Sequence, residues 1–199
     1  QSLLRSTRQQ YHQRIAQVLT ERFPETAETQ PEVLAQHYTA AGLYAHALPY
    51  WQRAGQRAVQ RSAHTEAVAH LSTGLALLKS LPDTPEHAQQ ELSLQVALGP
   101  ALMAAKGFGA PEVLHAYARA RELCQQVGET PESLPVVWGP GRIYCVGAEH
   151  QTARELAQQC LTLAQRVQDP ALLLVAHHAV GGTACFLGEV ARARAHLEQ

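Results

Sequence analysis

The sequence predicts an all-α fold, an α-solenoid of about ten antiparallel helices. Apolar residues recur at the three-to-four-residue spacing of amphipathic helices along most of the 199-residue chain. Short loops that contain Pro or Gly separate these segments, which favours antiparallel pairing of neighbouring helices. Pairs of glycines recur about every 40 residues, which indicates that the helical hairpins repeat.

Each predicted helix is bounded by Pro, Gly or a polar turn. In the first, Leu4, Tyr11 and Ile15 lie on one face and Pro24 ends the run, whereas Pro31 begins the second. The predicted helices span Leu3–Phe23, Pro31–Gly42, Tyr44–Arg61, Thr65–Leu81 and residues 86–106, 111–127, 132–147, 150–167, 170–187 and 189–199. Residues 1–199 are expected to form one domain, with the clearest repeat in 1–82 and longer repeats in 83–199. Because both ends fall within helical patterns, we expect a fragment of a longer protein.

The composition excludes several classes of protein. Hydrophobic residues make up 46% of the chain, charged residues 17%, and the net charge is −1, which excludes a disordered tail and a strongly basic nucleic-acid binder. No apolar run approaches the ~18 residues of a membrane span. The four cysteines, Cys124, Cys145, Cys160 and Cys185, form no C-x-x-C pair, so we expect buried, reduced thiols in a cytoplasmic protein.

Each glycine of a pair is expected to have its own structural role in the repeat. The first glycine of each pair is expected to let two helices approach closely, and the second to allow the turn. A buried alanine near the start of the next helix would keep the returning helix close. These residues are Gly99 and Gly107 with Ala116, Gly139 and Gly147 with Ala153, and Gly181 and Gly188 with Ala193.

Residues 34–54 carry the clearest single unit. Leu34, Ala35, Tyr38, Gly42, Tyr44, Ala47, Trp51 and Ala54 have the residue types and spacing of one repeat family. The unit resembles the tetratricopeptide repeat, which implies a right-handed superhelix. Residues 34–58 and 91–113 also resemble the C-terminal repeat region of large bacterial signalling ATPases of the AAA or STAND type, often fused to a nucleotide-cyclase-like domain. That resemblance implies an interaction or regulatory module whose catalytic residues lie in other domains.

Gly139-Pro140-Gly141 departs from the repeat, since it stands where a helix interior is expected. An interior Pro costs about 3 kcal/mol and each Gly about 1 kcal/mol in a helix. Together with Gly99-Pro100, this step would kink the helices in a common way. Alternatively, it breaks its helix and opens a pocket near Trp138, Arg142, Tyr144 and Cys145.

The sequence does not establish an enzymatic activity. It contains no P-loop, no G-x-S-x-G, no H-E-x-x-H and no Rossmann fingerprint, and no cofactor or metal is predicted. Glu66 with His70 and Glu112 with His115 share helix faces but are expected to be surface pairs. The repeat register brings Cys145, His178 and Cys185 near one another, which leaves open a small hydrolase or a thiol or metal site.

Arg53, Arg57 and Arg61 recur every four residues on one helix face. Such a row of arginines can contact phosphates, which leaves a nucleic-acid-binding repeat as a second alternative. Because the net charge is near zero, the sequence favours a solvated row of arginines.

The leading hypothesis is a protein-interaction scaffold of a cytoplasmic signalling ATPase. Its concave groove would bind a peptide or helix, from a partner or from another domain of the parent chain. The predicted groove residues are Gln36, Thr39, Val96, Met103, Val136, Ile143, Tyr144, His178 and Cys185. The last helix, which lacks a packing partner, is expected to fray or to form a homodimer through Val190 and Leu197.

Overall fold

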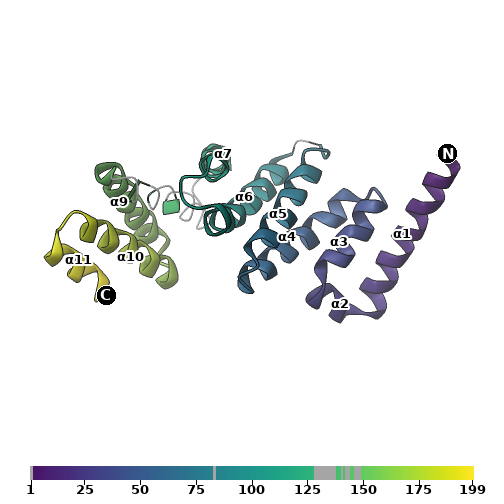
Figure 1. Ribbon diagram of the computed structural model, residues 1–199, viewed down its shortest axis with the longest axis horizontal. Coiled ribbons are helices and arrows are strands. Elements are labelled where there is room, and N and C mark those ends of the chain that lie inside the picture. Colours follow the sequence, from purple (N-terminus) through teal and green to yellow (C-terminus); the bar gives the residue numbers. More distant parts are fainter. Residues whose placement is uncertain (1, 83, 128–137, 140, 142–143, 146–148) are drawn as a thin grey trace. The chain divides into compact units, whose positions relative to one another are not determined.

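The computed structural model describes residues 2–82, 84–127, 138–139, 141, 144–145 and 149–199. These residues form α-helices joined by short turns and contain no strand (Figure 1). The contacts group the chain into two units, Gln1–Ala105 (unit 1) and Lys106–Gln199 (unit 2), so the subdivision predicted at residue 82 falls within unit 1. The prediction of an all-α fold is confirmed.

In the described residues, unit 1 contains six helices and unit 2 contains four. Those of unit 1 are α1 (Ser2–Arg22), α2 (Pro24–Thr29), α3 (Pro31–Ala40), α4 (Tyr44–Gln60), α5 (His64–Leu78) and α6 (Pro85–Lys106). Those of unit 2 are α7 (Pro111–Val127), α9 (His150–Val167), α10 (Pro170–Phe186) and α11 (Val190–Leu197). Most of the predicted helix 132–147 lies outside the described residues.

One short helix departs from the predicted order. The segment after Pro24 was expected to connect two helices, but it forms α2. Pro24 occupies the first turn of α2, where its missing N–H costs nothing, and Glu25 there interacts favourably with the helix dipole. The residue that ends α1 therefore also starts α2.

Several turns between consecutive helices share one hydrogen-bonded motif. After α3, the amide of Leu43 donates to the carbonyl of Tyr38, and Gly42 adopts a φ of +79°. The same bond joins Glu189 to Ala184 after α10, where Gly188 has a φ of +73°. Glycine adopts a positive φ without a Cβ clash. Gly42 and Gly188 can therefore end one helix and let the chain turn into the next.

The core of unit 1 is built around α3 and α4. Leu34, Tyr38 and Trp51 are buried in one cluster, and the indole N–H of Trp51 donates to Oγ1 of Thr39 at 3.0 Å. Helix α4 approaches α5 closely, because a Cβ atom on Gly55 would lie 2.4 Å from Cγ of Leu71. This arrangement accounts for most of the tetratricopeptide-like residues of the 34–54 segment.

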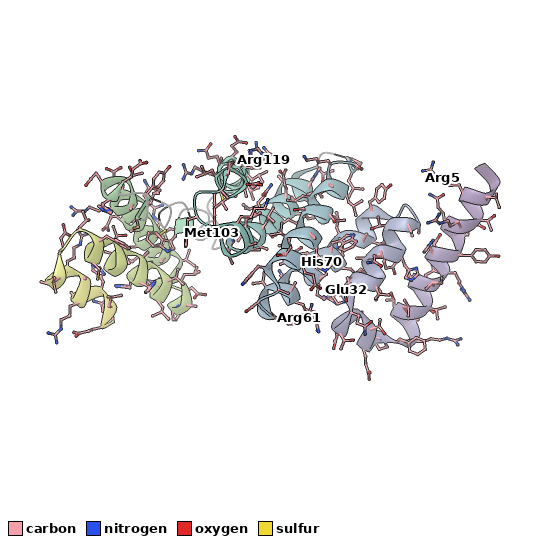
Figure 2. All side chains as sticks on the ribbon, viewed as in Figure 1. Arg5, Glu32, Arg61, His70, Met103 and Arg119 are labelled. Carbon is pink, nitrogen blue, oxygen red and sulfur yellow. The ribbon has the colours of Figure 1, made fainter. Side chains whose placement is uncertain are left out.

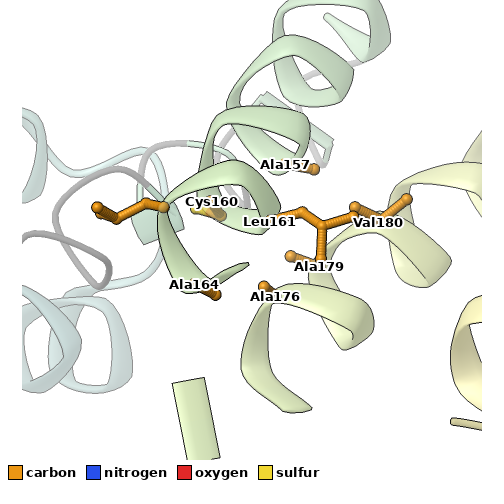
Figure 3. Packing of buried hydrophobic residues seen from close by; sticks show 8 residues of the cluster. Ala157, Cys160, Leu161, Ala164, Ala176, Ala179 and Val180 are labelled. Atoms are coloured by element: carbon orange, nitrogen blue, oxygen red, sulfur yellow. The ribbon is translucent and has the colours of Figure 1, made fainter. Parts of the chain in front are cut away.

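The core of unit 2 lies between α9 and α10. Figure 3 shows small side chains of α9 packed against small side chains of α10. The buried cluster contains Ala157, Cys160, Leu161, Leu163, Ala164, Ala176, Ala179 and Val180. Because most of these side chains are short, the two helices pack closely along their length.

The repeat prediction is confirmed in part and needs one change of register. Ala153 and Ala193 are both buried four residues after the turns that start α9 and α11. The bond from Glu149 to the carbonyl of Tyr144 matches the bond from Glu189 to Ala184, an offset of 40 residues. Cys145 therefore corresponds to Cys185, one residue away from the register set by aligning Gly147 with Gly188. Gly147 itself lies outside the described residues.

Candidate functional site

Helix α10 exposes a long face without charge. Between Pro170 and Phe186 the sequence contains no Asp, Glu, Lys or Arg. Leu174 is 68% exposed, Val175 42% and Phe186 59%. We define the α10 face as the side chains that share this side of the helix: Ala171, Leu174, Val175, His178, Gly182, Cys185 and Phe186. Exposed apolar patches occur at protein and membrane interaction sites and at ligand-binding grooves.

The opposite side of α10 explains why the helix is apolar all round. Ala176, Ala179 and Val180 face α9, and a Cβ atom on Gly181 would lie 2.6 Å from Cγ of Leu197 in α11. One side of α10 is therefore used for folding. The α10 face contributes to the fold at its C-terminal end, where the ring of Phe186 stacks on that of His150 of α9 with the ring centroids 5.9 Å apart.

The predicted groove residues differ in accessibility. Gln36, His178 and Cys185 are exposed, and Val96 and Tyr144 are half-buried. Thr39 is occupied within the fold, since it accepts from Trp51 and donates to the carbonyl of Ala35. Met103, labelled on α6 in Figure 2, is buried. Val136 and Ile143 lie outside the described residues. Two of the exposed positions, His178 and Cys185, belong to the α10 face.

The three residues of the predicted thiol site, Cys145, His178 and Cys185, differ in burial. Cys145 is buried, with its Sγ 3.6 Å from Oγ1 of Thr183, whereas Cys185 and His178 are exposed. Burial raises the pKa of the Cys160 thiol to about 12, so this thiol stays protonated and inert at neutral pH. No group of three or more His, Cys, Asp or Glu that could hold a metal ion occurs in the described part of the chain.

The glycines at 139 and 141 are packed by aromatic rings. A Cβ atom on Gly139 would lie 2.0 Å from the ring of Tyr117, and one on Gly141 would lie 2.5 Å from the ring of Trp138. Trp138 packs against the α9–α10 core. These contacts give both glycines a packing role. Pro140 and Arg142 lie outside the described residues, so the kinked and broken alternatives stay predictions.

The row of arginines on α4 is engaged within unit 1. Arg53 and Arg57 donate to the carbonyls of Ala27 and Glu28 in the last turn of α2, at 3.3 and 2.5 Å. Arg61, labelled in Figure 2, pairs with Glu66 at 3.2 Å. Cations commonly satisfy the free carbonyls of a helix C-terminus, so these contacts explain the arginines without a nucleic acid.

Two histidine pairs join neighbouring helices, and sequence reasoning missed both. The Nδ1 atoms of His12 and His37 are 2.9 Å apart, and those of His177 and His196 are 3.0 Å apart. In each pair one ring donates and the other accepts, so a second proton on the pair would break the contact. No local pattern signals these pairs, because their members belong to different helices. The adjacent His178 is exposed.

These pairs predict a loss of stability in mild acid. The pKa of His37 is lowered from the ordinary 6.5 by burial and by His12, and that of His196 by burial, His177 and Arg192. The unfolded chain therefore takes up protons at a higher pH than the folded chain. The stabilisation should be present above about pH 6.5 and lost progressively as the pH falls below it.

Urea unfolding at pH 7.5, 6.5 and 5.5 measures this effect. The double variant His37→Asn, His196→Asn should show a flatter dependence of the unfolding free energy on pH. The variant His178→Asn, at an exposed histidine, serves as control and should keep the dependence of the unchanged chain. An equal slope in all three proteins would contradict the prediction.

Comparisons with known proteins found a similar sequence and a similar solved structure. No protein-family model matches the chain. The chain is 24% identical over 181 residues to the uncharacterized protein R02095 of Rhizobium meliloti (strain 1021). The match covers 90% of this chain but only 17% of that protein. None of the described helices is both long and apolar enough to cross a membrane.

A solved structure shares the architecture. The crystal structure of BtubC (BKLC) from P. vanneervenii matches with a TM-score of 0.65 and 15% identity. The match covers 98% of this chain and 88% of BtubC. At this identity the similarity shows the fold alone. The chain is therefore similar in fold to another all-helical protein, and its own function must be argued from the residues described above.

Proposed function

We propose that this chain is a protein-binding helical module, which holds an amphipathic helix of a partner or of another domain on the α10 face. The observation that carries the proposal is the uncharged, exposed row of side chains on α10. At about 1.5 Å per residue, the 17 residues of α10 offer a row about 25 Å long. That length matches several turns of a docked helix.

The backbone of α10 argues for a helical occupant. Its amide and carbonyl groups are bonded within the helix, so α10 offers no edge for an added strand. An extended peptide on this face would leave its own backbone groups without partners. An amphipathic helix satisfies its own backbone and presents apolar side chains at the same three-to-four-residue spacing.

Gly182 provides the point of closest approach. A Cβ atom on Gly182 would meet no other atom within 4 Å, so the space beside it is open. Leu174 and His178 lie on one side of Gly182 along the helix, and Cys185 and Phe186 on the other. A large apolar side chain of the bound helix fits here, against the α10 backbone.

We also propose that this chain is one module of a longer protein. The chain spans 17% of the length of the Rhizobium relative, which supports a module within a much longer chain. The resemblance of residues 34–58 and 91–113 to repeats of bacterial signalling ATPases supports a cytoplasmic regulatory role. In this role, docking at α10 would bias an attached catalytic domain.

A display selection tests the proposal with a defined probe. A library of amphipathic-helix peptides, randomised at the apolar positions, is selected on the full chain. The enriched peptides should carry apolar residues at i, i+3, i+4 and i+7. Their affinity, measured by fluorescence anisotropy, should fall at least about tenfold for Leu174→Glu, because the new charge would be buried without a partner.

Leu4→Glu is the matched control. Leu4 is 76% exposed on α1, compared with 68% for Leu174, so both substitutions add a charge at an exposed leucine. The control should bind the selected peptides as the unchanged chain does. Failure to enrich any peptide, or equal binding by both variants, would contradict the proposal. Self-association that Leu174→Glu abolishes would instead identify a second copy as the occupant.

A further inference from the structure

Helix α1 has an exposed face that differs chemically from the α10 face. Tyr11 is 67% exposed, Ile15 is 42% exposed and Val18 is half-buried. Successive spacings of four and three residues place these side chains on one side of the helix. The packing of α1 within unit 1 uses another side, where Ala16 is buried in the α3–α4 core. The side that carries Tyr11 and Ile15 therefore faces solvent among the described residues.

Arginines flank these apolar side chains. Arg8 and Arg14 lie three residues before and after Tyr11, and Arg22 lies in the last turn of α1. All three arginines are exposed, and none of them forms an ion pair in the described part of the chain. We define the α1 basic row by these arginines and the apolar residues between them: Arg8, Tyr11, Arg14, Ile15, Val18 and Arg22.

The charges of α1 do not balance. The helix contains four arginines and one acidic residue, Glu21, so its formal net charge is +3, whereas that of the whole chain is −1. The arginines of α4 have partners inside the fold, since Arg53 and Arg57 donate to carbonyls of α2 and Arg61 pairs with Glu66. The arginines of the α1 basic row have no such partner. Their positive charge therefore selects for a negatively charged binding partner.

We propose that the α1 basic row binds an acidic amphipathic helix of a partner protein. The apolar side of that helix would lie on Tyr11 and Ile15, with its carboxylates beside the arginines. From Arg8 to Arg22 the row extends about 21 Å at about 1.5 Å per residue, which suits about four turns of a docked helix. The backbone of α1 is bonded within the helix, so the row offers no edge for an added strand.

The same row is less suited to an anionic membrane or to a nucleic acid. Helices that lie in a membrane interface bury a broad apolar face, whereas this row is narrow and has arginines on both sides. A nucleic-acid backbone presents charged phosphates, against which the aliphatic side chain of Ile15 would gain no apolar contact. An acidic amphipathic helix satisfies both the apolar and the charged side chains of the row.

Fluorescence anisotropy with two labelled peptides tests the proposal on the full chain. Both peptides form the same amphipathic helix, with Leu at the apolar positions. One peptide carries Glu at the flanking positions, and the other carries Lys there. The Glu peptide should bind at least about tenfold more tightly than the Lys peptide, because opposite charges meet at the interface. Its affinity should fall as the concentration of sodium chloride rises, since exposed charges are screened.

Charge variants assign the binding to the α1 basic row. Arg14→Glu should weaken binding of the Glu peptide severalfold. Arg121→Glu is the matched control, because Arg121 is exposed on α7 and the substitution changes the charge of the chain equally. The control should leave binding unchanged. The double variant Arg8→Glu, Arg14→Glu should reverse the preference, so that it binds the Lys peptide more tightly than the Glu peptide.

Several results would overturn the inference. Equal affinity of the two peptides for the unchanged chain is one, and equal binding by Arg14→Glu and Arg121→Glu is another. Tighter binding of phosphatidylserine vesicles or duplex DNA than of the Glu peptide would assign the row to a different class of partner. Self-association that Arg14→Glu abolishes would make a second copy the occupant. If the double Glu variant loses its helical circular dichroism, Arg8→Gln, Arg14→Gln adds no repulsion and should still weaken binding of the Glu peptide.

Discussion

Replacing Trp51 by alanine is expected to lower the unfolding free energy of unit 1 by about 3–5 kcal/mol, the usual cost of removing a large buried aromatic side chain. Trp51 packs with Leu34 and Tyr38 in the α3–α4 core, and its Cβ lies near Gly74 of α5. Its indole N–H also bonds Thr39. The loss would thus affect three helices at once. Urea unfolding followed by circular dichroism measures the change.

One variant separates the packing of Trp51 from its hydrogen bond, and a second variant serves as a surface control. Trp51→Phe keeps most of the buried ring and should cost much less than Trp51→Ala. Leu4→Ala, at an exposed position of α1, should change the unfolding free energy by no more than about 0.5 kcal/mol. If Trp51→Ala costs no more than Leu4→Ala, the account of the unit 1 core is wrong.

Two glycines within helices should respond to alanine with opposite signs. Alanine gains about 1 kcal/mol over glycine in a helix interior. At Gly182 nothing opposes this gain, because the space beside it is open, so Gly182→Ala should stabilise unit 2. At Gly55 the new methyl would lie 2.4 Å from Leu71, which is fully buried. Overpacking of this kind costs about 1–3 kcal/mol, so Gly55→Ala should destabilise unit 1.

Thermal unfolding of the two variants side by side measures the signs. Both variants replace a glycine within a helix by alanine, so the gain from helix propensity is the same in each. A difference between them therefore reports the packing around each glycine. A stabilised Gly55→Ala would mean that α4 and α5 are further apart than described. A destabilised Gly182→Ala would mean that the α10 face is already covered in the isolated chain.

The local features of the fold were predictable from the sequence because they depend on neighbouring residues. Pro and Gly mark nearly all of the observed helix boundaries, and the bounds of α7 and α9 agree with the predicted 111–127 and 150–167. The turn glycines Gly107 and Gly188 adopt positive φ as expected. Helix α2 was missed because a six-residue segment has too few apolar positions to show a period.

The candidate sites were less predictable because they depend on which faces of the helices pack together. The apolar sequence of α10 predicts a helix, but its exposed side is known only once α9 and α11 cover the other side. His178 and Cys185 were placed on an accessible surface, yet their apolar neighbours Leu174 and Phe186 were missed. His177 and His196 are 19 residues apart on different helices, and no local pattern connects them.

The most direct test of a helix docked on α10 uses a thiol that the face already contains. Cys185 is exposed on the α10 face, whereas Cys145 and Cys160 are buried and Cys124 lies on α7. Alkylation by iodoacetamide is followed by peptide mass spectrometry, with and without a saturating selected helix peptide. The account predicts that the peptide slows alkylation of Cys185 severalfold and leaves that of Cys124 unchanged. Alkylation of Cys185 at the same rate with and without bound peptide would contradict it.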